Sequence, residues 1–122
     1  MARILIAEDQ AELREMIALT LRLSGHEVEG AGDGKAAYQQ ARASHPDLII
    51  LDHEMPHLSG RQVCRKLKTF EAFSNTPILI ISSISDPIAV ERSLNAGASE
   101  YLSKPFELSR LIQRVDALLT AD

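Results

Sequence analysis

A short apolar run that ends in an acid constrains this chain more than any other feature. Residues 48–51 contain no polar side chain, and Asp52 follows them directly. A run of this length predicts a strand buried on both faces, as in parallel sheets. Pro56 then keeps the next segment open. Asp52 is therefore predicted at the carboxyl end of a central strand, where α/β sheets place their chemistry. On this stretch alone, a plain turn residue is an equal alternative.

Five strand-like runs alternate with five helix-like segments along the chain. The strands are predicted at residues 3–7, 26–31, 48–51, 78–81 and 100–102. The helices are predicted at about residues 9–23, 35–43, 59–70, 86–96 and 108–119. Right-handed crossovers between such elements specify a parallel sheet with helices on both faces. We therefore expect one domain over residues 1–122, an α/β fold built as a three-layer α/β/α sandwich, with its five-stranded parallel sheet in the order 2-1-3-4-5.

Short sequence patterns indicate where some of the predicted helices begin and which of their faces are buried. Asp9 with Glu12, and Ser59 with Gln62, have the spacing of capping boxes. One stripe of the first helix is expected to face the core, formed by Leu13, Met16, Ile17 and Leu21. Cys64, the single cysteine, falls on the apolar stripe of the third helix and is expected to be buried and inert. A lone thiol excludes an internal disulfide and fits a reducing cytoplasm.

Composition narrows the classes of function. With 45% hydrophobic and 25% charged residues, the chain is typical of soluble globular proteins. The net charge of −4 and the lack of a basic run argue against nucleic acid as a direct partner. No apolar run approaches the length of a membrane span, and the N-terminus is typical of a strand rather than a signal peptide. We therefore expect a cytoplasmic protein with no membrane partner.

The predicted strand order gathers polar side chains at one edge of the sheet. The ends of the first and third strands flank the crevice where such folds bind ligands, which brings Glu8 and Asp9 close to Asp52. Crowded carboxylates raise one another's pKa, and a divalent cation such as Mg²⁺ or Mn²⁺ removes the repulsion. Ser82 and Lys104, after the fourth and fifth strands, add a hydroxyl and an amine. This set predicts phosphoryl transfer, with Asp52 as the attacking carboxylate.

These motifs together resemble the receiver domain of bacterial two-component response regulators, of the chemotaxis-regulator-like type with a flavodoxin-like fold. The shared pattern is an acidic pair after strand one, Asp-x-x-Met-Pro-x-x-x-Gly after strand three, a hydroxyl after strand four and Lys-Pro after strand five. The resemblance spans essentially the whole chain. It implies that Asp52 accepts a phosphoryl group with the help of Ser82 and Lys104. The donor would be a phosphohistidine of a sensor histidine kinase or phosphotransfer protein.

The resemblance also implies a metal site. Asp9 and Asp52 would bind Mg²⁺ directly, Glu8 would act through water, and Glu54 would contribute its backbone carbonyl. Glu8 and Glu54 depart from the usual residues of the family. The longer acid at position 8 matters little for a water-mediated role. Glu54 lies beside the path of attacking water, so we expect its charge to alter the lifetime of the acyl phosphate.

A conformational switch is the third implication. Ser82 and the aromatic Tyr101 would move on phosphorylation, and the family makes the Lys104–Pro105 bond cis. The surface of the fourth helix, the fifth strand and the last helix would then change its affinity for a partner. That partner would be a downstream effector protein, an output domain of a longer regulator, or a second copy in a homodimer. Apart from its own phosphorylation and dephosphorylation, the domain would not be an enzyme.

Other functions fit the sequence less well. Phosphatases with a nucleophilic Asp normally place it on the first strand, with a second Asp two residues later. A flavin-binding protein should have a Ser/Thr/Gly-rich loop where residues 8–12 read EDQAE. The complete acid, hydroxyl and lysine set disfavours a receiver-like module that accepts no phosphate. His53 and His57 could bind a transition metal only if they converged, which Pro56 disfavours, so loop histidines are expected.

Overall fold

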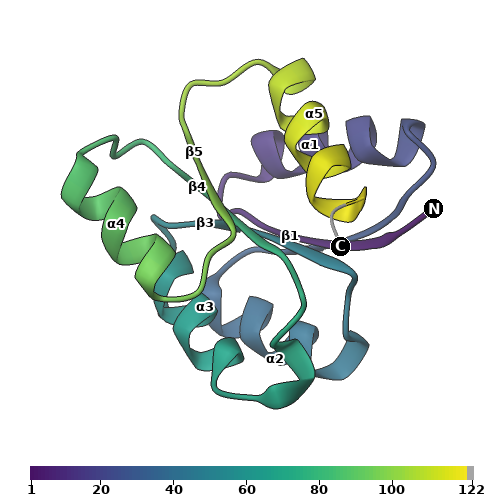
Figure 1. Cartoon of the computed structure of the whole chain (residues 1–122). Helices are drawn as coiled ribbons and strands as arrows, with labels where there is room; N and C mark the ends of the chain where they lie inside the picture. Colours follow the sequence, from purple (N-terminus) through teal and green to yellow (C-terminus); the bar gives the residue numbers. More distant parts are fainter. Residues whose placement is uncertain (121–122) are drawn as a thin grey trace.

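The computed structural model describes residues 1–120 as a five-stranded parallel sheet between two helical layers (Figure 1). The strands are β1 (Arg3–Ala7), β2 (Glu27–Ala31), β3 (Leu48–Asp52), β4 (Ile78–Ser82) and β5 (Glu100–Ser103). The helices are α1 (Ala11–Leu23), α2 (Gly34–Ser44), α3 (Gly60–Lys68), the 3-10 helix η1 (Glu71–Phe73), α4 (Pro87–Asn95) and α5 (Leu108–Thr120). The order β2-β1-β3-β4-β5 confirms the prediction.

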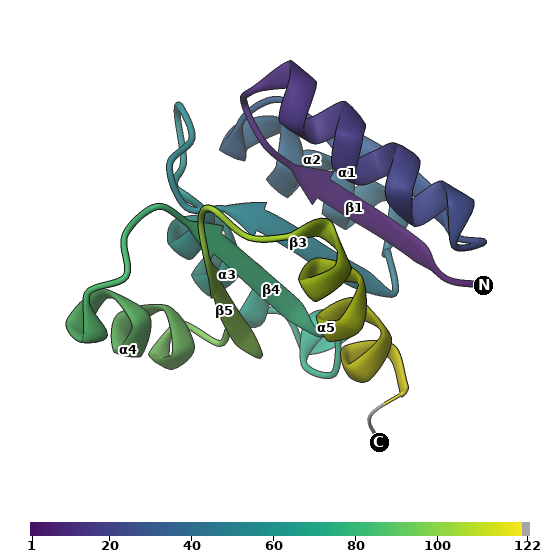
Figure 2. The same ribbon diagram turned by 90° about the horizontal axis from the view of Figure 1, so that it is seen from above.

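The sheet separates two apolar cores because alternate strand residues point to opposite faces. On one face, Ile4 and Ile6 pack with the buried sides of α1 and α5. On the other, Leu5 and Ala7 pack with α2 and α3. Figure 2 shows α1 and α5 in front of the sheet and α2 and α3 behind it. Every residue of β3 and β4 is buried, as the continuous apolar runs predicted.

The first helix differs from its prediction. Helix α1 begins at Ala11, and its N-cap residue Gln10 makes no capping hydrogen bond through its side chain, so the predicted Asp9–Glu12 capping box is wrong. Met16 was expected in the core but is 53% exposed. The buried face of α1 is formed by Ile17, Ala18 and Leu21. One residue corresponds to about 100° around a helix, so Met16 turns away from the sheet when Ile17 faces it.

Several other local predictions are confirmed. Ser59 and Gln62 form the reciprocal hydrogen bonds of a capping box at the start of α3. Cys64 is buried, and burial raises the pKa of its thiol to about 11. The Lys104–Pro105 peptide bond is cis. Within residues 1–120, none of the helices combines the length and apolar character needed to cross a bilayer.

Candidate functional site

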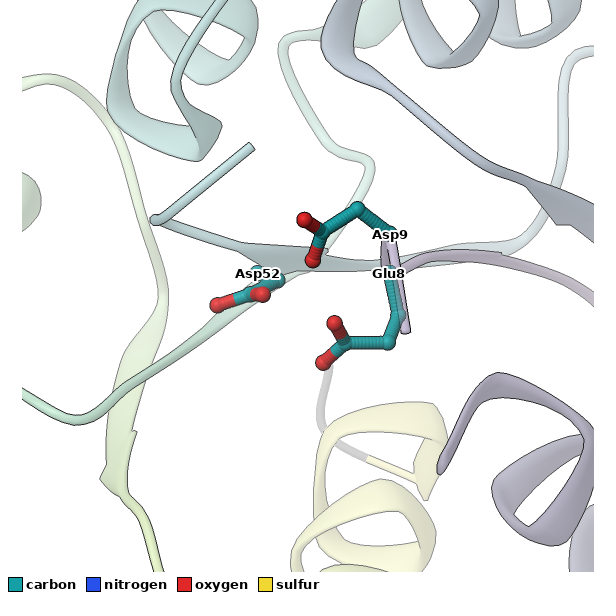
Figure 3. A group of neighbouring side chains, drawn as sticks. All are labelled: Glu8, Asp9 and Asp52. Atoms are coloured by element: carbon teal, nitrogen blue, oxygen red, sulfur yellow. The ribbon is translucent and has the colours of Figure 1, made fainter. Parts of the chain in front are cut away.

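Three carboxylates meet where β1 and β3 end. Ala7 pairs with Leu51 in the parallel register, so the next residues, Glu8 and Asp52, are neighbours across the two strands. Figure 3 shows Glu8 and Asp9 on opposite sides of the β1 end, with Asp52 beside them. One carboxylate oxygen from each of the three residues lies within 4.8 Å of the others. Glu8 and Asp52 are buried, and Asp9 is exposed. The structure therefore brings together the three acids predicted from sequence.

A single ammonium group partly balances this charge. Nζ of Lys104 lies 2.9 Å from Oε1 of Glu8 and 3.1 Å from Oδ2 of Asp52. The backbone of Lys104 is held at the sheet edge because its N–H donates to the carbonyl of Ser82 at 2.7 Å. Although burial lowers the pKa of Lys104, its contacts with Glu8 and Asp52 raise it above the usual lysine value. Lys104 therefore stays charged and belongs to the site.

The two buried acids divide one proton unequally. Burial, followed by the neighbouring Glu8 carboxylate, raises the pKa of Asp52 to about 7. Burial also acts to raise the pKa of Glu8, but hydrogen bonds from the Gln10 N–H and Lys104 lower it overall. The Gln10 N–H lies 3.1 Å from Oε2 of Glu8. Near neutral pH without a cation, Glu8 therefore holds the negative charge, while Asp52 is partly protonated.

The donor set fits a small divalent cation. Oδ2 of Asp52 is buried and, although it lies near the Lys104 ammonium, it accepts no hydrogen bond of acceptable geometry. Burial and the Glu8 carboxylate raise the pKa of Asp9, so these acids repel one another. An unsatisfied buried oxygen among hard carboxylate ligands is an environment suited to Mg²⁺ or Mn²⁺. The Glu54 N–H lies 3.3 Å from Oδ1 of Asp52, which places the Glu54 backbone beside the same group.

Ser82 is buried at the end of β4, but its hydroxyl donates to Glu54 rather than to the acid cluster. Its Oγ lies 2.6 Å from Oε2 of Glu54. The Ser83 N–H and hydroxyl both donate to Oε1 of Glu54, at 2.8 Å and 2.7 Å. Burial acts to raise the pKa of Glu54, but these hydrogen bonds lower it overall. The Glu54 carboxylate thus anchors the start of the β4–α4 loop, which sequence reasoning did not foresee.

The same loop is held at a second point. The half-buried Tyr101 donates its hydroxyl proton to the carbonyl of Ile84. The Ile84 N–H in turn donates to Oγ of Ser82, at 3.0 Å. Glu54, Ser82, Ile84 and Tyr101 are therefore linked by hydrogen bonds from β3 to β5.

Two further residues shape the site through the backbone. Nη1 of Arg14 donates to the carbonyl of Glu8 at 2.7 Å and fixes the end of β1. No sequence signal identifies Arg14, because its role depends on how α1 crosses the sheet. Gly60 explains the glycine of the Asp-x-x-Met-Pro-x-x-x-Gly motif, since a Cβ there would lie 2.5 Å from the carbonyl oxygen of Asp52. Only glycine lets α3 begin so close to the strand end.

The histidines beside the Met-Pro turn do not join the acids. His53 is half-buried, and burial lowers its pKa. His57 is exposed and has a φ of 72°. Within residues 1–120, the group of metal-capable side chains that converges consists of Glu8, Asp9 and Asp52. This arrangement favours hard oxygen chemistry over a histidine-based transition-metal site.

Comparison with known proteins agrees with this geometry. Residues 4–116 match the family model described as the response regulator receiver domain. The chain belongs to this family. Among solved structures, the receiver domain is similar to a putative response regulator from Chloroflexus aurantiacus, with a TM-score of 0.92, 34% identity and 98% coverage of both chains. It is also similar to chemotaxis response regulator CheY4 of Vibrio cholerae, with a TM-score of 0.92, 30% identity, and coverage of 97% of this chain and 98% of that one.

The receiver domain also has longer relatives. The DNA-binding response regulator MtrA of Mycobacterium tuberculosis is 38% identical over 117 residues, which cover 96% of this chain and 50% of the relative. Response regulator MprA of Mycobacterium leprae is 39% identical over 120 residues, with 96% and 50% covered. The chain thus spans about half the length of the relatives it matches. The receiver family and its flavodoxin-like fold confirm the resemblance seen in the sequence.

Proposed function

We propose that residues 1–122 form a single receiver domain in which Asp52 accepts a phosphoryl group from a phosphohistidine. The observation that carries this proposal is the convergence of Glu8, Asp9 and Asp52 with one ammonium group, Lys104, at the edge of the sheet. An Asp52 oxygen attacks phosphorus, the P–N bond breaks, and the leaving imidazole nitrogen keeps the electron pair. The product is an acyl phosphate on Asp52.

Each residue has a distinct task in this proposal. Asp9, Asp52 and the Glu54 backbone carbonyl would hold Mg²⁺ or Mn²⁺, and Glu8 would act through a bound water. When bound, the cation supplies positive charge that offsets the repulsion between the acids and the phosphoryl oxygens. Lys104 stabilises the same oxygens with a fixed charge, at a position it already occupies between Glu8 and Asp52.

Phosphorylation would also redirect the Ser82 hydroxyl. In the structure this hydroxyl donates to Glu54, and the phosphoryl group would offer a competing acceptor with more negative charge. Loss of that bond would loosen the loop that Glu54 and Tyr101 hold at either side. The surface formed by α4, β5 and α5 would then change its affinity for a partner, because a local charge biases a two-state segment. Ser82 and Tyr101 are the proposed switch residues.

The expected partners follow from this role. A sensor histidine kinase or phosphotransfer protein would supply the phosphoryl group, and an effector protein or an attached output domain would read the switched surface. A second copy of the domain could also bind the switched surface, which would give a homodimer through α4, β5 and α5. MtrA is named as a DNA-binding response regulator. In a longer regulator of that kind, the output domain attached to this receiver domain would bind DNA. The domain itself would catalyse only its own phosphorylation and dephosphorylation.

Intact mass spectrometry tests the acceptor. The protein is incubated with phosphoramidate or acetyl phosphate in the presence of Mg²⁺. We expect the mass of one phosphoryl group to be added to the wild type, and no addition to Asp52→Asn or to wild type with the chelator EDTA. An unmodified wild-type protein after prolonged incubation, or equal labelling of Asp52→Asn, would contradict the proposal.

A second experiment addresses the competing enzyme class. A phosphatase with a nucleophilic Asp would turn over a free phosphomonoester such as p-nitrophenyl phosphate many times. We expect no multiple turnover from the wild-type protein, because phosphorylation of Asp52 is the endpoint of the proposed reaction until water removes the group. Sustained release of p-nitrophenol that disappears in Asp52→Asn would favour the phosphatase instead.

A further inference from the structure

Helices α2 and α3 carry a charge opposite to that of the rest of the chain. Together they hold six of the 13 basic side chains and none of the 17 acidic ones, although the whole chain has a net charge of −4. The two helices pack against each other on the same side of the sheet (Figure 1). Their exposed basic side chains, which we call the basic face, are Lys35, Arg42, Arg65 and Lys66.

The other two basic residues of these helices are used inside the fold. Arg61 donates to the hydroxyl of Ser93 and to the carbonyl of Ala89 on α4. Lys68 donates to backbone carbonyls, including that of Thr76 at 2.7 Å. Arg61 and Lys68 are therefore committed to hydrogen bonds inside the fold, whereas the four side chains of the basic face are exposed.

Two aromatic rings hold part of the basic face in place. The Arg42 guanidinium lies 4.5 Å from the ring centre of Phe70 and 5.6 Å from that of Tyr38. Nζ of Lys66, on the other helix, lies 5.2 Å from the Tyr38 ring. These cation–π contacts stabilise both cations across the α2–α3 boundary, and both side chains stay exposed although Nη1 of Arg42 also donates to the Tyr38 hydroxyl at 3.5 Å. The rings thus reduce the conformational entropy that a bound anion would otherwise have to remove.

The basic face has no internal counter-charge. In the part of the chain that the structure describes, the ion pairs involve Lys104 and Arg114, both outside this face. Like charges within a Debye length of about 8–10 Å repel one another, and an acidic ligand removes that cost. The basic face is therefore electrostatically complementary to an anion that the domain itself does not supply.

We propose that the basic face binds a short acidic segment of a partner protein. Carboxylate side chains can pair with the guanidinium of Arg42 and the ammonium of Lys66, and the half-buried rings of Tyr38 and Phe70 offer apolar contact beside them. This surface lies on α2 and α3, apart from the α4–β5–α5 surface of the proposed switch. The domain would thus hold one partner irrespective of phosphorylation, while the switched surface responds to it.

The charge distribution favours an acidic peptide over nucleic acid. A duplex extends beyond a patch of four cations and carries one negative charge per about 1.7 Å. It would also meet the surface around the basic face, and none of the acidic residues of the chain belongs to α2 or α3. A short acidic segment can contact the basic face without spanning the surface around it. The net charge of −4 disfavours binding of a long DNA duplex, but it does not prevent a short acidic peptide from contacting the basic face.

Fluorescence anisotropy with a labelled decaglutamate peptide tests the basic face. We expect saturable binding that weakens as NaCl is raised, and a loss of affinity of about tenfold or more in the double variant R42Q/K66Q. The matched control is R92Q/R110Q, which removes the same charge from exposed positions on α4 and α5 and should change affinity less than about twofold. Chemical-shift changes in ¹⁵N spectra should centre on α2 and α3.

Every other outcome overturns the inference. These outcomes are no peptide binding up to about 1 mM, equal losses in R42Q/K66Q and R92Q/R110Q, or shift changes centred elsewhere. A 12-base-pair DNA duplex is tested in parallel. Tighter binding of the duplex that is lost in R42Q/K66Q would assign the basic face to nucleic acid instead. Matching circular dichroism spectra and melting temperatures of wild type and both variants confirm that the readout reports binding rather than unfolding.

Discussion

The two sides of the site differ in whether their polar side chains contact Asp52, the proposed phosphoryl acceptor. On the β1–β3 side, the acids Glu8 and Asp52 face the Lys104 ammonium at 2.9 Å and 3.1 Å, so charge is already gathered around the proposed acceptor. On the β4–β5 side, Ser82 donates its proton to Glu54, and Tyr101 donates to Ile84. The hydroxyls of Ser82 and Tyr101 on this second side are bonded to Glu54 and Ile84 rather than to Asp52.

In the proposed function, this difference separates the residues that support phosphoryl transfer from those that pass the signal on. The first side is crowded with like charge, which the proposed cation would offset. On the second side the Ser82 hydroxyl already donates to Glu54, so in the proposed mechanism it would exchange that partner for the phosphoryl group on Asp52. We infer that variants of the first side change phosphorylation most strongly, whereas variants of the second side shift the balance between two arrangements of the loop.

The largest effect is expected for Lys104→Met. Removing the ammonium leaves Glu8 and Asp52 buried without a counter-charge, which should lower the free energy of unfolding by about 3 kcal/mol at pH 8. Phosphorylation by phosphoramidate should slow by about a hundredfold or more, because a preorganised charge at the reacting oxygens is lost. Urea unfolding and the rate of mass increase measure the two effects.

The pH dependence and a matched variant make this prediction stricter. The loss of stability in Lys104→Met should shrink towards pH 5, because Asp52 is then protonated and no longer needs the ammonium, whereas Glu8 keeps its charge. Arg110→Met removes an exposed cation from α5 and should cost less than about 0.5 kcal/mol. If Lys104→Met and Arg110→Met unfolded alike, the first side would not be held together by charge as described.

Cation binding should be the next largest effect, and it should depend on pH. Burial and Glu8 raise the pKa of Asp52 to about 7, so a proton competes with Mg²⁺ below that pH. The apparent affinity should therefore fall about tenfold from pH 8 to pH 6, with nearly one proton released per ion at pH 6. Calorimetric titrations in two buffers of different ionisation enthalpy measure both quantities.

The same pKa has a consequence for stability without the cation. Asp52 binds its proton more tightly in the folded than in the unfolded protein, because its folded pKa of about 7 lies above the usual aspartate pKa of 3.8. Its contribution to stability is therefore largest below about pH 4 and is lost as the pH rises to about 7. Asp52→Asn should remove this dependence. Cation binding that is equally tight at pH 6 and pH 8 would contradict the pKa assignment.

Most of the fold was predictable because its signals are local and repeated. The runs that became β3 and β4 are continuous and apolar, and each is completely buried. Five alternations of strand and helix leave few topologies, and the observed order is the predicted one. The error at α1 arose where several alignments of an apolar stripe were compatible with the sequence, since Met16, Leu19 and Leu23 are all exposed. Packing against the sheet, rather than periodicity alone, selected Ile17 and Leu21.

The site was predictable to the extent that it depends on strand ends. Asp52 is the last residue of β3, and Glu8 and Lys104 directly follow β1 and β5, so topology alone brings them together. The hydrogen bonds of Glu54 and Arg14 could not be predicted, because they depend on the directions of side chains after the elements have packed together. The basic face was missed for a related reason. Its four residues are divided between two helices, and no single run of sequence is strongly basic.

Glu54→Asn is expected to act on the second side of the site. This variant removes the carboxylate that binds Ser82 and Ser83, so the Ser82 hydroxyl becomes available to the phosphoryl group. Each hydrogen bond is worth about 1 kcal/mol, which corresponds to about a fivefold change in the balance between loop arrangements. Phosphorylation should therefore speed up about fivefold, and the lifetime of the acyl phosphate should change. Mass spectrometry over time follows gain and loss of the group.

Ser83→Ala is the matched control for Glu54→Asn. It removes one donor to Glu54 but leaves the hydrogen bond between Ser82 and Glu54 in place. Its effect on both rates should be less than about twofold. Equal dephosphorylation rates in wild type and Glu54→Asn would show that Glu54 does not set the lifetime. Equal phosphorylation rates would show that Ser82 is not restrained by Glu54.

The smallest effect is expected for Tyr101→Phe, which keeps the ring and removes only the hydroxyl that donates to Ile84. The half-buried hydrogen bond should contribute about 0.5–1 kcal/mol to the free energy of unfolding. Because the Ile84 N–H donates to Ser82, the free energy of opening measured by hydrogen exchange at that amide should fall by a similar amount. The exchange rates of the β1 amides should not change. Uniform acceleration across the sheet would mean that Tyr101 stabilises the whole fold, and the two sides of the site would then not be separable.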